Sequence, residues 1–291
     1  MPYDKSVPPT PHRRPLSAVL AAVCLSLTAA GCGAGADGGP SGQLGGPGPG
    51  GDGASAASSR PEGRSVSGPL AGKTVVIDPG HNPDNYLHTR EINRQVDIGS
   101  GRKECDTTGT STETGYAEAL FTLDVSRRMR DLLRAQGAKV VLTQDGDRPY
   151  GPCVDERARI GNEAKADAVV SVHADGSAVG NRGFHVILPG PVRAGKADTS
   201  KIVEPSRDLG ARIAELFLRT TGSTPSNYIG DKTGLDVRKD LGGLNLSTVP
   251  KVFIECGNMR DPKDAAQLTS AGWRQKAAQG IADGISSYLK G

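Results

Sequence analysis

The sequence predicts an α/β fold: a single domain with a largely parallel, twisted sheet flanked by helices on both faces. Three observations lead to this prediction. Short apolar runs of strand length alternate with longer segments whose apolar residues recur every three or four positions. Several of the runs are continuously apolar, which is typical of parallel strands buried on both faces. About 220 of the 291 residues lie outside a Gly-rich N-terminal region, which is the size of one ordinary domain.

The elements of the first half follow this alternation. Residues 73–78 form a continuous apolar run that a Pro-Gly turn closes, so we expect a buried strand there. The polar, Gly- and Thr-rich stretch 82–115 is long for a loop, and we therefore expect it to be functional. Between 116 and 136 the apolar residues fall on one helix face, and Gly137 ends that helix. Residues 139–142 are the next strand.

The second half continues in the same way. A short helix with an acidic N-cap comes first, because Asp155 stands at its start. Two helices with an apolar face and three apolar strands complete the domain. In chain order we expect these elements at 155–166 (helix), 168–172 and 184–188 (strands), 207–220 (helix), 252–254 (strand) and 275–289 (helix).

The N-terminal region is typical of an export signal followed by a linker. Residues 1–31 combine Arg13 and Arg14 with an apolar run and small residues, as a signal peptide does. The sequence Ala-Ala-Gly-Cys32 resembles a bacterial lipobox, which implies a lipid on Cys32; the alternative is an ordinary cleaved secretory signal. Residues 32–71 are rich in Gly, Pro and Ser and lack aromatic residues, so we expect a disordered linker. We therefore expect an exported protein at the outer face of the cell membrane or in the cell envelope, or a secreted one.

Charge and cysteine content narrow the compartment and the partners. The formal net charge is +3, and three basic residues and one acidic residue precede Cys32, which leaves +1 for the rest of the chain. Such a near-neutral domain has no electrostatic basis for binding nucleic acid. Three cysteines follow the signal region, Cys105, Cys153 and Cys256. In an oxidising compartment an odd number indicates one bridge and one buried thiol, and the sequence alone allows all three pairings.

Four polar side chains stand where a parallel sheet places active sites, at the carboxyl ends of strands. His81 follows the first strand, His173 ends the third and Glu255 ends the last, while Glu118 begins the first helix on its buried face. Two His and one Glu are a ligand set that zinc accepts, with a fourth position left for water. A second Glu beside that water would act as its general base. Taken singly, each His also fits a hydrogen-bonded packing residue, and Glu118 fits an acid favoured by the helix dipole.

Four further polar residues carry weaker expectations. Asp78 and Asp175 are candidates for supporting the metal ligands, and they equally fit simple turn or cap residues. We expect structural roles for His88, in the polar stretch, and for His185, inside a strand.

Four sequence blocks carry the candidate site residues: Val-Ile-Asp-Pro-Gly-His81, Gly-Tyr-Ala-Glu118, Val-Ser-Val-His173-Ala-Asp and Pro-Lys-Val-Phe-Ile-Glu255-Cys-Gly-Asn. In this order they resemble the four blocks of the zinc-dependent N-acetylmuramoyl-L-alanine amidases of the amidase-3 type. The resemblance covers essentially the whole globular part and implies a catalytic domain at 72–291. It also implies that the two His and Glu118 are zinc ligands and that Glu255 is the catalytic glutamate.

The resemblance further implies a disulfide, and the chain departs from the family at two positions. The sequence is most similar to actinobacterial secreted members, which share the segment Gly-Pro-Cys153-Val-Asp-Glu-Arg and in which the positions of Cys105 and Cys153 form a disulfide. In many members Glu-Lys follows the ligand glutamate, where this chain has Ala119. In many members Thr follows the catalytic glutamate, where this chain has Cys256. Because side chains alternate along a strand, we expect Cys256 to point away from Glu255 as a packed thiol.

The function that the resemblance implies is hydrolysis of the amide between N-acetylmuramic acid and L-alanine in peptidoglycan, in cell-wall turnover or remodelling. Zn²⁺ is the expected cofactor, peptidoglycan or muropeptides the expected substrate, and a monomer with a lipid anchor in the membrane the expected form. The stretches 82–115 and 227–243 would line the substrate groove. Two alternatives stay open: another zinc peptidoglycan peptidase, because the ligands define the metal better than the substrate, and a non-catalytic wall-binding or regulatory lipoprotein.

Overall fold

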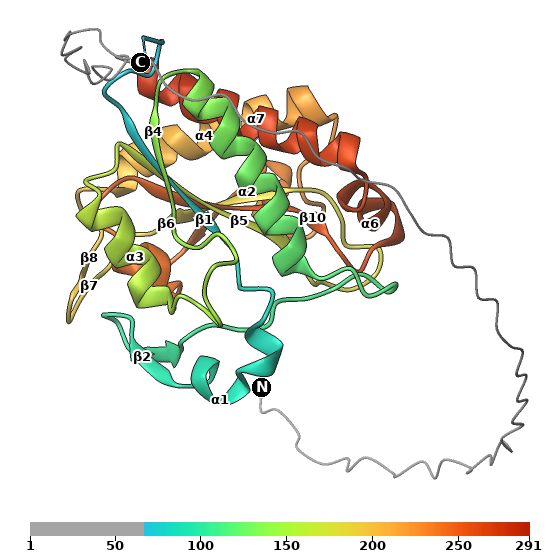
Figure 1. The fold of residues 1–291 in the computed structure, drawn as a ribbon, viewed down its shortest axis with the longest axis horizontal. Helices are drawn as coiled ribbons and strands as arrows, with labels where there is room; N and C mark the ends of the chain where they lie inside the picture. The colour runs from blue at the N-terminus through green and yellow to red at the C-terminus, as the bar shows by residue number, and fades with distance from the viewer. Residues whose placement is uncertain (1–66) are drawn as a thin grey trace, which may run out of the picture. The chain divides into compact units, whose positions relative to one another are not determined.

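The computed structural model describes residues 67–291, which fold around one six-stranded sheet (Figure 1). The strand order is β4-β1-β5-β10-β6-β9, and all neighbours are parallel except β10 and β6. This confirms the predicted α/β domain with a largely parallel sheet. The strands are β1 (Thr74–Pro79), β4 (Lys139–Leu142), β5 (Ala168–Asp175), β6 (His185–Pro189), β9 (Leu235–Arg238) and β10 (Lys251–Asn258).

Helices cover both faces of the sheet. The three longest lie on one face; they are α2 (Glu118–Ala135), α4 (Val203–Thr221) and α7 (Ala271–Lys290). Helices α2 and α4 contact the strands, and α7 contacts both of these helices. The other face carries α3 (Val154–Glu163) and the short α5 (Gly242–Asn245), which contact each other. A further helix, α6 (Pro262–Leu268), follows β10. Within the described residues no helix has the length and apolar character needed to cross a membrane.

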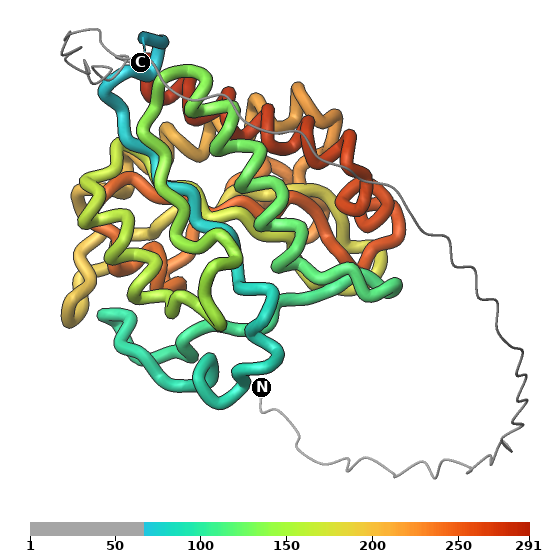
Figure 2. Tube along the Cα trace, in the orientation of Figure 1, coloured from blue at the N-terminus to red at the C-terminus, as the bar shows by residue number. Residues whose placement is uncertain are grey.

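The alternation of side chains along the strands divides the interior into an apolar and a polar part. In β5, Val170 and Val172 belong to the main hydrophobic core under α2, α4 and α7, whereas Ser171 and His173 point to the opposite face. Strand β10 repeats the pattern, since Ile254 lies in the core. Figure 2 shows how β10, orange, comes to lie beside strands from much earlier in the chain. The polar part therefore forms on the face of α3 and α5, at the carboxyl ends of β1, β5 and β10.

The stretch 82–115 is more ordered than the predicted loop. It contains elements of only three or four residues, namely a 3-10 turn at Asn85–Leu87, α1 (Thr89–Ile92), β2 (Gln95–Asp97) and β3 (Arg102–Glu104). A separate small hydrophobic cluster of Val96, Ile98 and the two half-cystines stabilises it. Elements this short show no hydrophobic period, which is why the sequence predicted a loop.

Two other predictions about local structure were wrong, and several short elements were not predicted. Helix α3 begins at Val154 with Cys153 as its N-cap and no side-chain cap, so Asp155 lies in the first turn instead. Residues 67–71, assigned to the linker, pack on the domain, because Leu70 is fully buried and its N–H donates to Gln136 O. The short elements at the edges were not predicted: β9, α5, α6 and the hairpin of β7 (Arg193–Ala194) and β8 (Ala197–Asp198). The predicted signal peptide, the lipidation site Cys32 and most of the linker lie outside the described residues.

Candidate active site

The three predicted metal ligands converge at the carboxyl end of the sheet. His81 follows β1, His173 lies near the end of β5 and Glu118 is the first residue of α2. His81 Nε2 lies 3.2 Å from Glu118 Oε2, and His173 Nδ1 lies 3.0 Å from Glu118 Oε1. One ligand atom from each residue falls within 4.8 Å of the others. The three side chains thus surround a single point with two imidazole nitrogens and a carboxylate oxygen.

The side chains of Glu118 and His173 are held by neighbouring groups. The carboxylate of Glu118 accepts hydrogen bonds from the backbone N–H groups of Thr110, at 3.0 Å, and Ala174, at 3.2 Å. The imidazole of His173 stacks on the ring of Phe253, with centroids 5.2 Å apart and planes at 11°. The two imidazoles are nearly perpendicular, at 89°. These contacts fix the orientation of the Glu118 carboxylate and of the His173 ring.

The charges at the site favour a cation. Burial alone would raise the pKa of Glu118, but His81 and His173 lower it well below its usual value. Burial alone would lower the pKa of His81, but Glu118 and Asp106 raise it well above the usual value. The carboxylates that favour a proton on this imidazole favour a divalent cation for the same reason. The donor set of two nitrogens and one oxygen fits zinc.

Glu255 stands beside these ligands in the same cleft. In the sheet register it lies next to His173 of β5, and its side chain is on the same face. Its Oε2 is buried and has no hydrogen-bond partner among the described residues. Burial raises the pKa of Glu255 well above its usual value, and the carboxylates of Glu118 and Asp175 raise it further. A carboxylate without hydrogen-bond partners, next to a candidate metal site, is suited to act as a proton acceptor.

Comparison with known proteins gives this geometry a family. Residues 75–287 match the family described as N-acetylmuramoyl-L-alanine amidase. The chain belongs to this amidase family. It is 42% identical over 225 residues to the N-acetylmuramoyl-L-alanine amidase Rv3717 of Mycobacterium tuberculosis. The aligned region covers 76% of this chain and 88% of that protein.

Solved structures agree with the assignment. The crystal structure of the amidase Ami1 from Mycobacterium smegmatis superposes with a TM-score of 0.69 at 40% identity, covering 77% of this chain and 99% of that one. Ami1 from Mycobacterium abscessus, crystallised in its apo form, gives the same TM-score at 42% identity, covering 76% of this chain and 100% of that one. The match therefore spans the whole folded part of both relatives.

The cleft of the amidase has a volume of about 270 Å³ and opens between the predicted loops. The stretch 82–115 contributes Thr107 and Gly109 to its wall, and 227–243 contributes Arg238 and Leu241. Both stretches therefore line the groove, as expected. A second pocket of about 200 Å³ adjoins the cleft, and His81, His173 and Phe253 line both.

The two aspartates singled out from the sequence occupy different places. Asp175 lines the cleft and accepts a hydrogen bond from the hydroxyl of Tyr228. Asp78 is fully buried beneath the site and touches none of the three ligands. It accepts hydrogen bonds from four side chains instead, which are Thr143, Arg157, Ser171 and Lys251.

The remaining His and Cys residues do not belong to the three-ligand cluster. His88 packs beside Tyr150, and His185 is buried with its Nδ1 unpartnered among the described residues. Cys105 and Cys153 form the predicted disulfide. Cys256 is a buried free thiol in the main core, on the opposite face from Glu255, as the alternation along β10 predicted.

Sequence reasoning missed the residues that surround His81 on the side away from the cleft. Asp106 Oδ1 lies 3.4 Å from His81 Nδ1, and Arg157 donates to Asp106 and to the carbonyl of His81. One signal was available, because Arg157 shares the buried face of α3 with Ala158 and Gly161. An arginine on an apolar helix face must be paired inside the protein.

Proposed function

We propose that this amidase is a zinc-dependent hydrolase that cleaves the amide between the lactyl group of N-acetylmuramic acid and L-alanine in peptidoglycan. The observation that carries the proposal is the convergence of His81, Glu118 and His173 beside Glu255 in one open cleft. The names of the relatives support the substrate, because Rv3717 and Ami1 are both called N-acetylmuramoyl-L-alanine amidases.

Three residues would hold the zinc, and one would handle the proton. The zinc ligands would be His81, Glu118 and His173, and three protein ligands are the number that a catalytic zinc site uses when it keeps a position for water. Zinc bound there would supply a Lewis acid for the scissile carbonyl and would lower the pKa of water to about 7. Glu255 would accept a proton from the attacking water and pass it to the leaving amine of L-alanine. The carbonyl carbon gains the water oxygen, the C–N bond breaks and the proton ends on the nitrogen.

The surface next to the cleft supports a long substrate. A hollow of about 410 Å³ adjoins it and is lined by Tyr86, polar residues of the stretch 108–111 and Arg260. Tyr86 is 64% exposed, so its ring is available to a ligand. A cleft that continues into a second hollow suits a substrate that extends on both sides of the bond to be cut.

The compartment is part of the same proposal. An amidase of the cell wall must act outside the cytoplasm, and the disulfide between Cys105 and Cys153 agrees with an oxidising environment. We propose that a lipid on Cys32 holds a monomeric enzyme at the outer face of the membrane. The full chain should then partition into the membrane fraction, whereas Cys32→Ala should be soluble; recovery of both in the soluble fraction would remove the anchor from the proposal.

Mass spectrometry of products from a defined muropeptide tests the function. The full chain should release the intact stem peptide and leave the sugar part bearing a free lactyl carboxylate. A chelator should abolish both products, and added zinc should restore them. Cleavage between two amino acids of the stem would make the protein a peptidase, and intact substrate in the presence of zinc would contradict catalysis altogether.

A further inference from the structure

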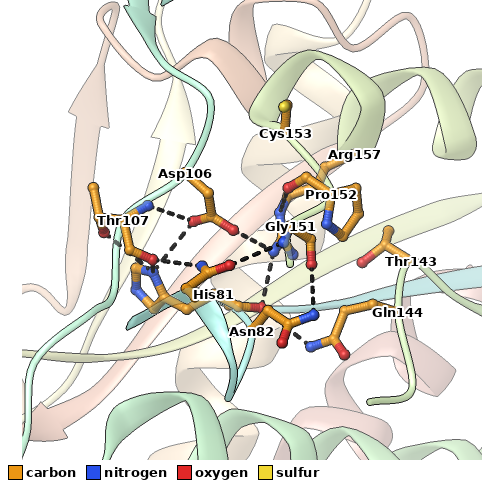
Figure 3. A network of polar contacts seen from close by, with 12 residues as sticks. His81, Asn82, Asp106, Thr107, Thr143, Gln144, Gly151, Pro152, Cys153 and Arg157 are labelled. Carbon is orange, nitrogen blue, oxygen red and sulfur yellow. Dashed lines mark hydrogen bonds and ion pairs between the residues drawn. The ribbon is translucent and has the colours of Figure 1, made fainter. Parts of the chain in front are cut away.

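We infer that Arg157 is a positioning residue of the active site. It holds His81 both by the backbone carbonyl and, through Asp106, by the imidazole ring (Figure 3). This inference deepens the proposed function and rests on it, because it takes His81 to be a metal ligand.

The backbone of His81 needs support from outside. Its φ is 61°, in the left-handed region that residues with a side chain rarely adopt, and such a conformation persists only where the surroundings hold it. The His81 carbonyl accepts hydrogen bonds from Arg157 Nη2, at 2.9 Å, and from Gln144 Nε2, at 3.1 Å. Arg157 Nη1 also donates to the carbonyl of Pro79, at 2.6 Å. One guanidinium thus fixes two carbonyls of the turn that leads from β1 into the site.

The imidazole of His81 is oriented from its far side. Arg157 Nη2 donates to Asp106 Oδ2 at 2.8 Å, and the other oxygen of that carboxylate lies 3.4 Å from His81 Nδ1. The carbonyl of Thr107 lies 3.1 Å from the same nitrogen. These acceptors favour a hydrogen on Nδ1, so that Nε2, 3.2 Å from Glu118, presents a lone pair to a metal. Arg157 sets the position of Asp106 and thereby the direction of the ring.

Arg157 itself is fixed by its surroundings. Its side chain is only 6% exposed, so water cannot replace the contacts. Its Nε donates to the carbonyl of Pro152, and Nη1 donates to Asp78 Oδ1 at 2.7 Å. The disulfide joins Cys105, next to Asp106, to Cys153, the N-cap of α3. The arginine and the carboxylate that it holds are therefore tied together covalently as well as by charge.

The arrangement requires the planar fork of an arginine. Arg157 makes its five contacts with Nε, Nη1 and Nη2 in one plane, and a lysine ammonium in the same place carries the charge without that geometry. Arg157→Lys should therefore keep an ion pair with Asp78 or Asp106 and lose the hydrogen bonds to the backbone carbonyls of the turn. Since partners behind a ligand typically change metal affinity by about 10- to 100-fold, we expect a weakening of that size.

The test measures metal binding by the full chain, independently of catalysis. Zinc affinity is obtained by competition with a chromophoric chelator, and cobalt(II) is then bound in place of zinc so that its visible spectrum reports the ligand geometry. Arg157→Lys should bind zinc about 10- to 100-fold more weakly and should show an altered cobalt spectrum. Arg159→Lys is the matched control, because Arg159 lies on the same helix and pairs with Glu163 at the exposed surface.

The outcomes separate this inference from the proposed function. Wild-type protein that binds no zinc overturns both. Wild-type protein that binds zinc, together with an Arg157→Lys protein of equal affinity and equal cobalt spectrum, overturns the positioning role alone. Should Arg157→Lys fail to fold, Asp106→Asn carries the test, since it keeps the size of the side chain and removes the charge facing His81; unchanged affinity and spectrum in that variant would equally overturn the inference.

Discussion

The two faces of the central sheet are built from the same strands and do different work. Along β5, Val170 and Val172 enter the core under the three long helices, and Ser171 and His173 enter the polar region under α3. The apolar face gains free energy from burial, which depends little on the position of any one atom. The polar face buries paired ions, whose attraction largely offsets their cost of desolvation, so that removal of one partner is destabilising. Their hydrogen bonds also fix positions.

The polar face shows how closely buried charges are matched. Asp78 and Asp106 are paired with Arg157, and Lys251 donates to Asp78 at 3.1 Å while it lies over the ring of Phe253. That ring in turn stacks on His173. The charge cluster therefore supports the candidate ligands from below, and the comparison teaches that stability and site geometry should respond to different substitutions.

Replacement of a metal ligand on the polar face should have the largest effect on activity. It therefore distinguishes most clearly between the roles of the polar and the apolar face. His173→Ala removes one of three ligands, so zinc and amidase activity should be lost together, to the level of the chelator-treated wild type. Metal content by elemental analysis and hydrolysis rate on the same preparation check this. Retention of one equivalent of zinc by the variant would show that His173 is not a ligand.

A substitution on the apolar face should lower the stability of the fold and leave zinc binding nearly unchanged. Phe217, in α4, packs with its ring centroid 4.9 Å from that of Phe184 and 6.0 Å from that of Trp273. Phe217→Ala should lower the free energy of unfolding by about 3–5 kcal/mol, because it leaves a cavity in the core. Denaturant titration measures the loss. Zinc affinity of the folded protein should stay within a factor of about two, and a tenfold fall would mean that the two faces are coupled.

The smallest effect concerns pH and the buried Asp78. Burial alone would raise its pKa, but Lys251 and Arg157 lower it well below the usual value. Its charge therefore stabilises the fold above about pH 4, and that contribution is lost as the pH falls below the pKa of the unfolded chain. Asp78→Asn should be less stable than wild type by about 1–3 kcal/mol at pH 7, and the difference should shrink toward pH 2. A difference that is constant from pH 7 to 2 would contradict the role of the charge.

The sequence predicts the four residues of the candidate site better than it predicts the residues that hold them in place. Strand ends and a helix start placed His81, Glu118, His173 and Glu255, and the structure brings these four together because parallel strands end at one edge. The order of the four sequence blocks also indicated the family, and the resemblance to that family implied the disulfide. Arg157 ends the shared segment Gly-Pro-Cys153-Val-Asp-Glu-Arg and lies on an apolar helix face, but neither pattern indicated its contacts with His81.

The residues that the sequence analysis missed contact residues that are far away in the sequence. Asp106 and Arg157 are 51 positions apart and meet only because the disulfide and α3 bring them together. The elements between 82 and 115 were missed for a related reason, since strands of three residues are stabilised by a partner strand and a small cluster instead of by their own pattern. Local patterns thus reveal the apolar face and the ligands, and long-range pairing decides the rest.

Glu255→Gln tests the central claim most directly, because it changes the proton acceptor and leaves the metal site intact. The variant keeps the size and shape of the side chain, so the protein should stay folded and hold about one equivalent of zinc, while turnover falls by roughly 10² or more. Metal content and amidase rate are measured on the same preparation beside wild type. Loss of zinc would make Glu255 a ligand, and full activity would mean that the proton is handled by another group.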